Sequence, residues 1–146
     1  MFQLKGIAMD KALSTQVGGA HYKGMVIEPF TFALANHYDA ACFSILKYVS
    51  RHAAKNGAQC LAKASHICMI RADEYPEEMR VSARDVIPME DYVGKNGIPF
   101  REAQILYDLH TWARGRMETL TDRETAGWIA RRIDALSRET YRKDPQ

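Results

Sequence analysis

The central part of the chain carries apolar residues at intervals of three and four, which is the spacing of helices with one buried face. The first such stripe, between position 39 and about position 56, consists of Cys42, Ile45, Leu46, Val49 and Ala53. Asp39 stands where it can cap this helix, and Asn56-Gly57 is a typical helix stop. The second stripe, which ends before Pro76, consists of Leu61, Ala64, Ile67, Cys68 and Arg71. Because the link between the stripes is short, they predict an antiparallel helical hairpin.

Shorter patterns predict helices on both sides of this hairpin. Glu28-Pro29 favours a helix start, and that helix is expected to end near Asn36-His37. Residues 101–114 predict a helix, stopped by Gly115, with buried Ile105, Leu106, Leu109 and Trp112. Thr121 and Glu124 have the spacing of a capping box at the start of a last helix. Its expected buried positions are Trp128, Ile129, Ile133 and Leu136, and the polar residues 138–146 are expected to fray.

The remaining segments predict irregular structure and one more short helix. Residues 1–15 have the character of a loose leader, and residues 17–24 form a glycine-rich loop. Residues 77–86 predict a short helix, while residues 87–100 predict a loop, or at most a small hairpin at Asn96-Gly97. No internal repeat is evident, and no stretch alternates with period two. We therefore expect an all-α, compact helical bundle: one domain over residues 1–146, with the hairpin at its centre.

Composition and charge narrow the class of protein. A chain of 146 residues with 47% hydrophobic and 26% charged residues is typical of one globular domain. A formal net charge of only +2 argues against a protein dedicated to binding duplex nucleic acid. No apolar run reaches the roughly 20 residues needed to span a bilayer. With no signal-peptide pattern, an odd number of cysteines (Cys42, Cys60 and Cys68) predicts buried thiols in the cytoplasm.

Lys47, Arg51 and Lys55 recur every four residues and would form a row of cations on one helix face. Such a row can bind phosphate groups, because ammonium and guanidinium groups are charge-assisted donors. The same spacing is also typical of an ordinary solvated face. Tyr48 lies beside this row and could stack on a nucleobase or belong to the core.

Other candidate chemistry is weaker. Gly19 and Gly24 have the spacing of a phosphate-binding P-loop, but Met25-Val26 stands where lysine and serine or threonine are required. The loop can still present His21, Tyr22 and Lys23 to a ligand, and His21, followed by His66, is the best acid–base candidate. The histidines and cysteines lack zinc-binding spacing, so no metal site is predicted.

An acidic group after the hairpin suggests a different function. Asp73, Glu74, Glu77 and Glu78 lie close in sequence, and an all-α, metal-dependent nucleotide pyrophosphohydrolase holds Mg²⁺ with helical carboxylates of this kind. Pro76 interrupts the helical register of these residues, so they cannot share one helix face.

Several of these residues together resemble the shared domain of small tailed-phage nucleotide kinases. The similarity rests on His21-Tyr22, Ile27-Glu28-Pro29, Lys47-Tyr48 with Arg51, Lys55-Asn56-Gly57, Leu61 and Lys63-Ala64. Their order and spacing agree over about residues 17–75, and residues 76–146 lie outside the resemblance.

The resemblance implies transfer of a phosphoryl group from a nucleoside triphosphate to a deoxynucleoside monophosphate such as dGMP or dTMP. The family has no Walker motif and implies no metal requirement, so protein cations would neutralise the phosphates. His21, Lys47 and Arg51 would be catalytic. Substrate-binding residues would be Tyr22, Lys23, Tyr48, Lys55, Asn56 and Lys63. The location would be the host cytoplasm, and a small helical hairpin is expected to need a homo-oligomer to cover its second face.

The chain departs from the family pattern at two places. Phe43-Ser44 replaces a usual Gly-Asn pair, and Cys60 replaces a usual acidic residue. Two other functions therefore stay open beside the kinase. One is a non-catalytic protein that sequesters a nucleotide, for example a signal of host defence, and the other is a structural or interaction module.

Overall fold

The computed structural model describes residues 24–142, and over that part of the chain it contains helices and no strands, which confirms the all-α prediction. Its α-helices are α2 (Pro29–Asn36), α3 (Ala40–Arg51), α4 (Ala58–Glu74), α5 (Met89–Asn96), α6 (Phe100–Arg114) and α7 (Asp122–Tyr141). Short 3₁₀ turns at His52–Ala54 and Glu77–Met79 follow α3 and α4.

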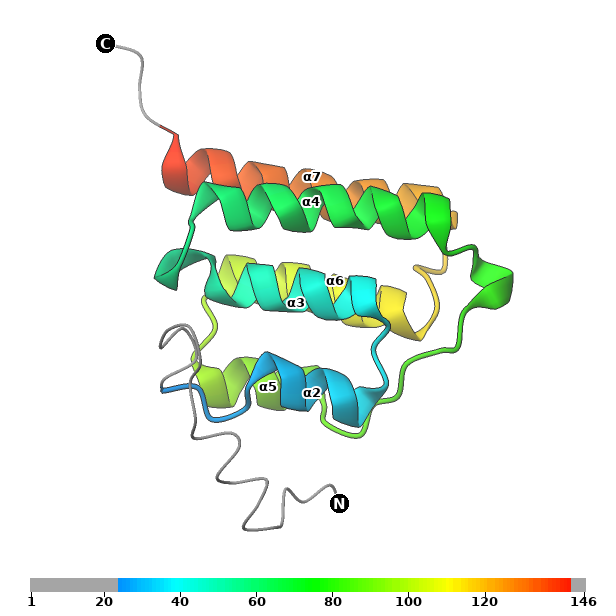
Figure 1. The fold of residues 1–146 in the computed structure, drawn as a ribbon, viewed down its shortest axis with the longest axis horizontal. Coiled ribbons are helices and arrows are strands. Elements are labelled where there is room, and N and C mark those ends of the chain that lie inside the picture. The colour runs from blue at the N-terminus through cyan, green and yellow to red at the C-terminus, as the bar shows by residue number, and fades with distance from the viewer. Residues whose placement is uncertain (1–23, 143–146) are drawn as a thin grey trace.

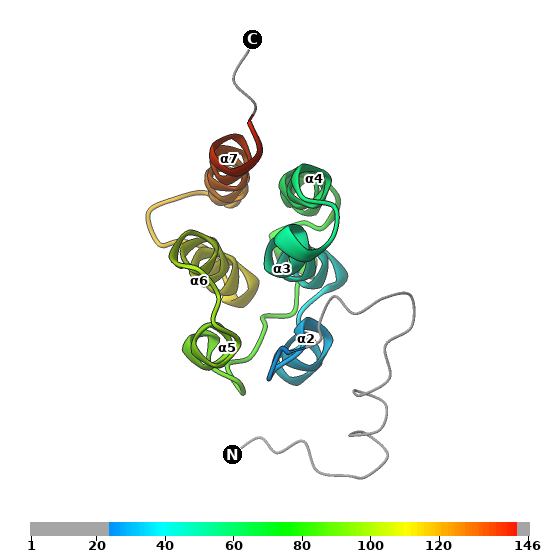
Figure 2. The same cartoon turned by 90° about the vertical axis from the view of Figure 1, so that its left-hand side faces the viewer.

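The helices form two layers of three (Figure 1). Figure 2 shows α2, α3 and α4 stacked in one layer and α5, α6 and α7 in the other. The predicted antiparallel hairpin is α3–α4, and it packs on the other layer through α4 against α7 and α3 against α6. The core lies between the layers and includes the fully buried side chains of Phe32, Tyr92 and Trp112.

The two layers repeat one three-helix unit, which corrects the expectation of no internal repeat. Over the first two helices of each unit, residues 60 positions apart correspond, with identical residues at Ile27/Ile87, Asn36/Asn96, Ile45/Ile105 and Leu46/Leu106. α2 and α5 also end alike: His37 and Gly97 both adopt left-handed backbone, with φ of 57° and 62°. In both helices the next amide donates to the carbonyl five residues back, as in a Schellman motif (Tyr38 to Ala33, Ile98 to Val93).

A reciprocal pair of hydrogen-bond clamps joins the two repeats. The Asn36 side chain donates to the Ile87 carbonyl at 2.8 Å and accepts from the Ile87 amide at 2.8 Å. Asn96 makes the equivalent bonds with Ile27, donating at 2.7 Å and accepting at 2.9 Å. Each asparagine thus ends its own helix and holds the segment that leads into the equivalent helix of the other repeat.

Asn36→Ala is expected to lower the free energy of unfolding by about 2–4 kcal/mol, because two groups of Ile87 would lose their partners in a buried site. Asn36 is fully buried, whereas Asn96 is half-buried and also binds the exposed Val26 amide. Asn96→Ala is therefore the matched control, with a smaller loss because water can reach the freed groups. Urea denaturation of both variants measures the difference; equal losses would contradict the role of burial.

The hairpin follows the predicted stripes except at Ala53, which is exposed, and at Ile67, which is only half-buried. Cys42, Ile45, Leu46 and Val49 of α3 are buried, and so are Leu61, Ala64, Cys68 and Arg71 of α4. Ala53 is exposed, because the helix gives way to a 3₁₀ turn after Arg51 and rotates His52 inward instead. In α7 Trp128 is 39% exposed, while Ile129, Ile133 and Leu136 are buried as expected.

The segment before α6 differs from the prediction. Residues 77–86 do not form one helix: the 3₁₀ turn ends at Met79 and an irregular segment follows. In that segment the amides of Ala83 and Arg84 donate to the carbonyls of Ala113 and Asn36. Residues 87–100 are not a loop or hairpin but contain α5, for which Asn96-Gly97 is the C-terminal stop. In both places bonds to distant residues decide the conformation, which local turn signals cannot show.

The C-terminal helix is longer and better anchored than its polar sequence indicates. Its predicted capping box is confirmed, with Thr121 and Glu124 bonded reciprocally. The helix continues to Tyr141 instead of fraying from residue 138, because Tyr141 packs on the turn between α3 and α4. Its ring lies about 3.1 Å from where a Cβ of Gly57 would stand, so position 57 requires glycine for space as well as for its φ of 52°.

The structure also bears on three expectations from composition. All three cysteines are free and buried, and burial raises the pKa of the Cys68 thiol to about 12. Within residues 24–142 no helix is long and apolar enough to cross a membrane. The face of the α3–α4 hairpin for which a second copy was expected is covered by α6 and α7 of the same chain, so that argument for a homo-oligomer no longer applies.

Candidate functional site

Part of the predicted site gathers around one aromatic ring on the α3–α4 face. The Tyr48 ring has Lys47 Nζ at 4.8 Å, Arg51 Cζ at 4.9 Å and Lys63 Nζ at 5.6 Å from its centroid. We call these four residues the Tyr48 cluster. Lys47, Tyr48 and Arg51 come from α3 and Lys63 from α4, so the hairpin brings together residues that are up to 16 positions apart in the sequence.

The positions within the cluster follow from the hairpin. Lys47 and Arg51 are one turn apart and share a face of α3. Lys63 reaches the same ring because α4 returns antiparallel beside α3. Tyr48 itself is half-buried and packs on the core, which explains how a single ring can be held in place among flexible cationic side chains.

Burial and electrostatic repulsion both act on Lys47 in this cluster. Burial lowers the pKa of Lys47, and the charges of Arg51, Lys55 and Lys63 lower it further. Between residues 24 and 142 no carboxylate forms an ion pair with Lys47, Lys55 or Lys63. An anion bound here would relieve this repulsion, which is the condition expected of a phosphate site.

The other predicted residues lie around the cluster or outside the described part. Lys55 does not continue the helical row, because α3 ends at Arg51; it is exposed on the turn that follows the 3₁₀ segment. Asn56 is exposed on the same turn, and its carbonyl accepts from the amide of Gln59. His21, Tyr22 and Lys23, proposed to close over the site, lie outside the described residues.

His52, which sequence reasoning did not select, supports the turn below the cluster. It is buried, its Nε2 donates to Glu102 at 2.9 Å, and its Nδ1 lies 2.6 Å from the Tyr141 hydroxyl. Burial acts to raise the pKa of Glu102, but the hydrogen bond from His52 and other contacts outweigh it, so the pKa is below its ordinary value. The His52 carbonyl in turn accepts from the Gly57 amide at 2.8 Å. A lone histidine before a helix stop gives no sequence signal for this role.

The acidic group after α4 does not form a compact metal-binding set. Asp73 pairs with Arg123, and Glu77 pairs with Arg116 at 3.3 Å, so two of its carboxylates have cationic partners. Across residues 24–142 no group of three or more histidine, cysteine or acidic side chains is placed to hold a metal ion.

The two positions where the chain departs from the nucleotide-kinase pattern have defined surroundings in the structure. Cys60 is buried, at 1% exposure, on the inner side of α4. Phe43 is half-buried one turn before Lys47, and the Lys47 ammonium lies 5.3 Å from its ring centroid. The ring of Phe30 meets Phe43 edge to face, with centroids 5.7 Å apart.

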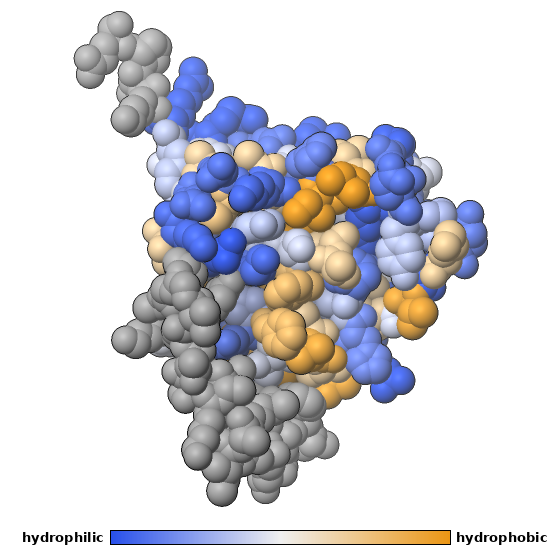
Figure 3. Space-filling model, in the orientation of Figure 1, coloured by the Kyte–Doolittle hydropathy of each residue, from blue (hydrophilic) through white to orange (hydrophobic). Residues whose placement is uncertain are grey.

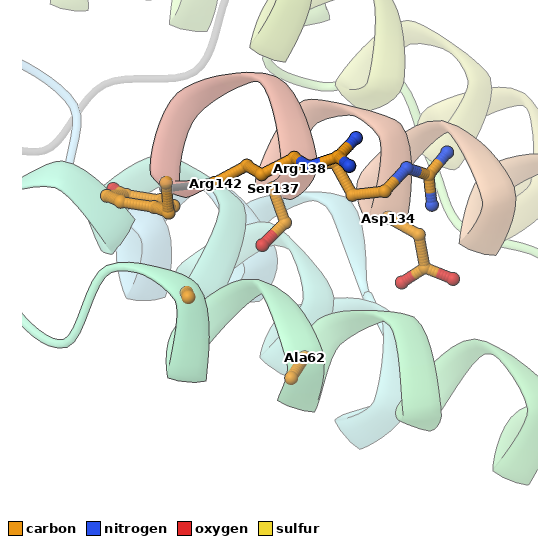
Figure 4. Close-up of a pocket in the computed structure, with 7 residues that line it drawn as sticks. Ala62, Asp134, Ser137, Arg138 and Arg142 are labelled. Carbon is orange, nitrogen blue, oxygen red and sulfur yellow. The ribbon is translucent and has the colours of Figure 1, made fainter. Parts of the chain in front are cut away.

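A hollow of about 500 Å³ lies away from this cluster, between the start of α4 and the end of α7 (Figure 4). Ala58 and Ala62 leave room on α4, while Asp134 and Ser137 point from α7 toward it. Arg138 and Arg142 also line it and add two cations. The Asp134 carboxylate makes this hollow less suited to a phosphate than the Tyr48 cluster, whose charged groups are all positive.

Comparison of this chain with family models, with curated proteins and with solved structures gives no match.

Proposed function

We propose that this chain binds a phosphorylated nucleotide at the Tyr48 cluster and transfers a phosphoryl group from a nucleoside triphosphate to a deoxynucleoside monophosphate. The observation that carries the proposal is the convergence of Lys47, Arg51 and Lys63 on Tyr48, with no carboxylate of the described residues paired to either lysine. The resemblance to tailed-phage nucleotide kinases supports it through the same residues.

The chemistry that this site can supply is electrostatic. An oxygen of the acceptor phosphate forms a bond to the γ-phosphorus of the donor, and the bond from that phosphorus to the β-bridging oxygen breaks. The products are a deoxynucleoside diphosphate and the diphosphate of the donor. A phosphate monoester has a second pKa of about 6, so the acceptor is ionised at neutral pH and needs no general base. Cations neutralise the charge on the transferred group, which is the main requirement of phosphoryl transfer.

Lys47 has the central place in this scheme. Its side chain is part-buried, and the pKa that burial and neighbouring cations lower would rise again when phosphate binds. Arg51 adds a planar guanidinium that can hold two phosphate oxygens at once. Lys63 binds from the opposite helix, so a ligand on the cluster would bridge α3 and α4.

The test is an assay for turnover in the presence of EDTA. Purified protein incubated with dGMP or dTMP and ATP is expected to form the deoxynucleoside diphosphate, detected by chromatography, and Lys47→Ala is expected to form none. Lys95→Ala, which removes one exposed lysine of α5, is the matched control and should retain turnover.

A non-catalytic nucleotide-binding protein is the second candidate, and Phe43 is the observation that favours it. Its side chain fills a position where the kinase pattern has glycine, directly beside Lys47. If no nucleotide pair yields a diphosphate but nucleotides raise the melting temperature of the protein, the kinase is excluded and the non-catalytic nucleotide-binding protein is supported. If the protein shows no turnover and nucleotides cause no thermal shift, both the kinase and the nucleotide-binding protein are excluded.

A further inference from the structure

An apolar hollow of about 450 Å³ lies between α2 and the start of α3. Phe30, Leu34, Tyr38 and Phe43 contribute most of its walls. Phe30 and Leu34 are 55% and 58% exposed, which is high for large apolar side chains. Figure 3 shows apolar surface over α2 and the start of α3, next to hydrophilic surface farther along α3 and α4.

Phe43 connects this hollow to the cluster. Phe43, Lys47 and Arg51 follow one another at intervals of four on a single face of α3. The Lys47 ammonium contacts both regions, because it lies 5.3 Å from the Phe43 centroid and 4.8 Å from the Tyr48 centroid. Four residues of α-helix advance about 6 Å, a spacing that one nucleotide can bridge between its base and its phosphate.

We propose that Phe43 stacks on the base of the nucleotide whose phosphate binds at the Tyr48 cluster, with the hollow between α2 and α3 as the base subsite. This inference rests on the proposed function and adds the placement of the base. The hollow has the size and apolar lining expected of a ligand site, and stacking on an aromatic ring is a common way to hold a base. The edge-to-face contact with Phe30 fixes the orientation of the Phe43 ring.

The walls of the hollow favour stacking over reading of the base edge. The Tyr38 hydroxyl, which could have served as a hydrogen-bond group, lies 2.6 Å from His110 Nδ1 and is already engaged. The other lining side chains are hydrocarbon except for the exposed His37. The subsite should therefore prefer purines to pyrimidines through their larger stacking area.

The experiment compares a ligand that has a base with one that lacks it. Binding of dGMP and of 2-deoxyribose 5-phosphate is measured by calorimetry on the full chain and on Phe43→Leu, Phe43→Tyr and Lys63→Ala. Phe43→Leu keeps an apolar side chain of similar bulk, so the fold is retained, and Phe43→Tyr keeps the aromatic ring.

Phe43→Leu is expected to weaken dGMP binding about tenfold and 2-deoxyribose 5-phosphate binding less than about twofold, while Phe43→Tyr retains both. Lys63→Ala is expected to weaken both ligands by a similar factor, since both carry the phosphate. Equal weakening of the two ligands by Phe43→Leu, or an unchanged dGMP affinity, would overturn the base subsite and leave the proposed function standing. Failure of the unaltered chain to bind either ligand would overturn the proposed function itself.

Discussion

Replacing both Lys47 and Lys63 with alanine is expected to weaken nucleotide binding at least about 100-fold, since each charge-assisted hydrogen bond contributes roughly 1.5–3 kcal/mol. The two lysines approach the Tyr48 ring from different helices, at 4.8 Å and 5.6 Å. Neither lysine has an ion-pair partner among residues 24–142, so the substitutions break no salt bridge within that part of the protein. The loss of affinity therefore measures the contacts of the lysines with the nucleotide. Removing two mutually repelling charges should leave the stability of the fold unchanged or slightly higher.

Calorimetric titration with dGMP, together with urea denaturation, separates binding from folding in this double variant. Lys95→Ala is the control, because it removes a lysine charge from α5 in the other repeat. Retained affinity in the Lys47/Lys63 variant would exclude the Tyr48 cluster as the phosphate site. A large loss of affinity in Lys95→Ala would mean that overall charge, and not this cluster, attracts the ligand.

Arg71→Met is expected to cause the largest loss of stability, about 3–5 kcal/mol, because it removes one partner of a buried ion pair. Arg71 is 1% exposed, and its Nε and Nη2 atoms donate to one oxygen of Asp39 at 3.0 Å and 2.9 Å. Its guanidinium also lies 4.3 Å from the ring centroid of the buried Trp112. Asp39 caps α3 by accepting from the Cys42 amide, so the pair joins the start of α3 to α4 and to the core.

The free energy of unfolding from urea denaturation measures this effect, with Arg131→Met, an exposed arginine of α7, as the control. Methionine keeps most of the volume of the Arg71 side chain, so the loss reflects the ion pair and not a cavity. A loss below about 1 kcal/mol would show that the buried pair contributes little beyond the hydrophobic packing of its neighbours.

The helices themselves could be predicted from the sequence where the apolar stripe is long. The hairpin of α3 and α4 and the last two helices were found, although α3 ends at Arg51 and not near Asn56. The capping box at Thr121 was found from two residues. Prediction was wrong where the signals are short. α5 was missed because Gly94 and Asn96-Gly97 favour a turn, whereas Asn96 in fact reaches the Ile27 backbone of the other repeat.

The repeat could not be recognised from the sequence because its identical residues are few and the residues of the Tyr48 cluster are not repeated. The positions that correspond to Lys47, Tyr48 and Arg51 at a separation of 60 are Tyr107, Asp108 and Thr111. In the second repeat Asp108 accepts a hydrogen bond from Trp128 and pairs with Arg132 at 3.6 Å. The two layers thus share a backbone plan, but within the described residues only the first gathers Lys47, Arg51 and Lys63 around one tyrosine ring.

The sequence by itself determined the helical class, the hairpin and the identity of the cations, because these depend on periodicity and on the local chemistry of caps and stops. Only the tertiary structure decided which of those cations share a site. It separated Lys55 from the helical row, brought Lys63 to Tyr48, and placed Phe43 between that cluster and the apolar hollow of α2. Contacts between helices depend on packing and on hydrogen bonds between residues far apart in the chain, such as Asn36 with Ile87, and no local pattern encodes them.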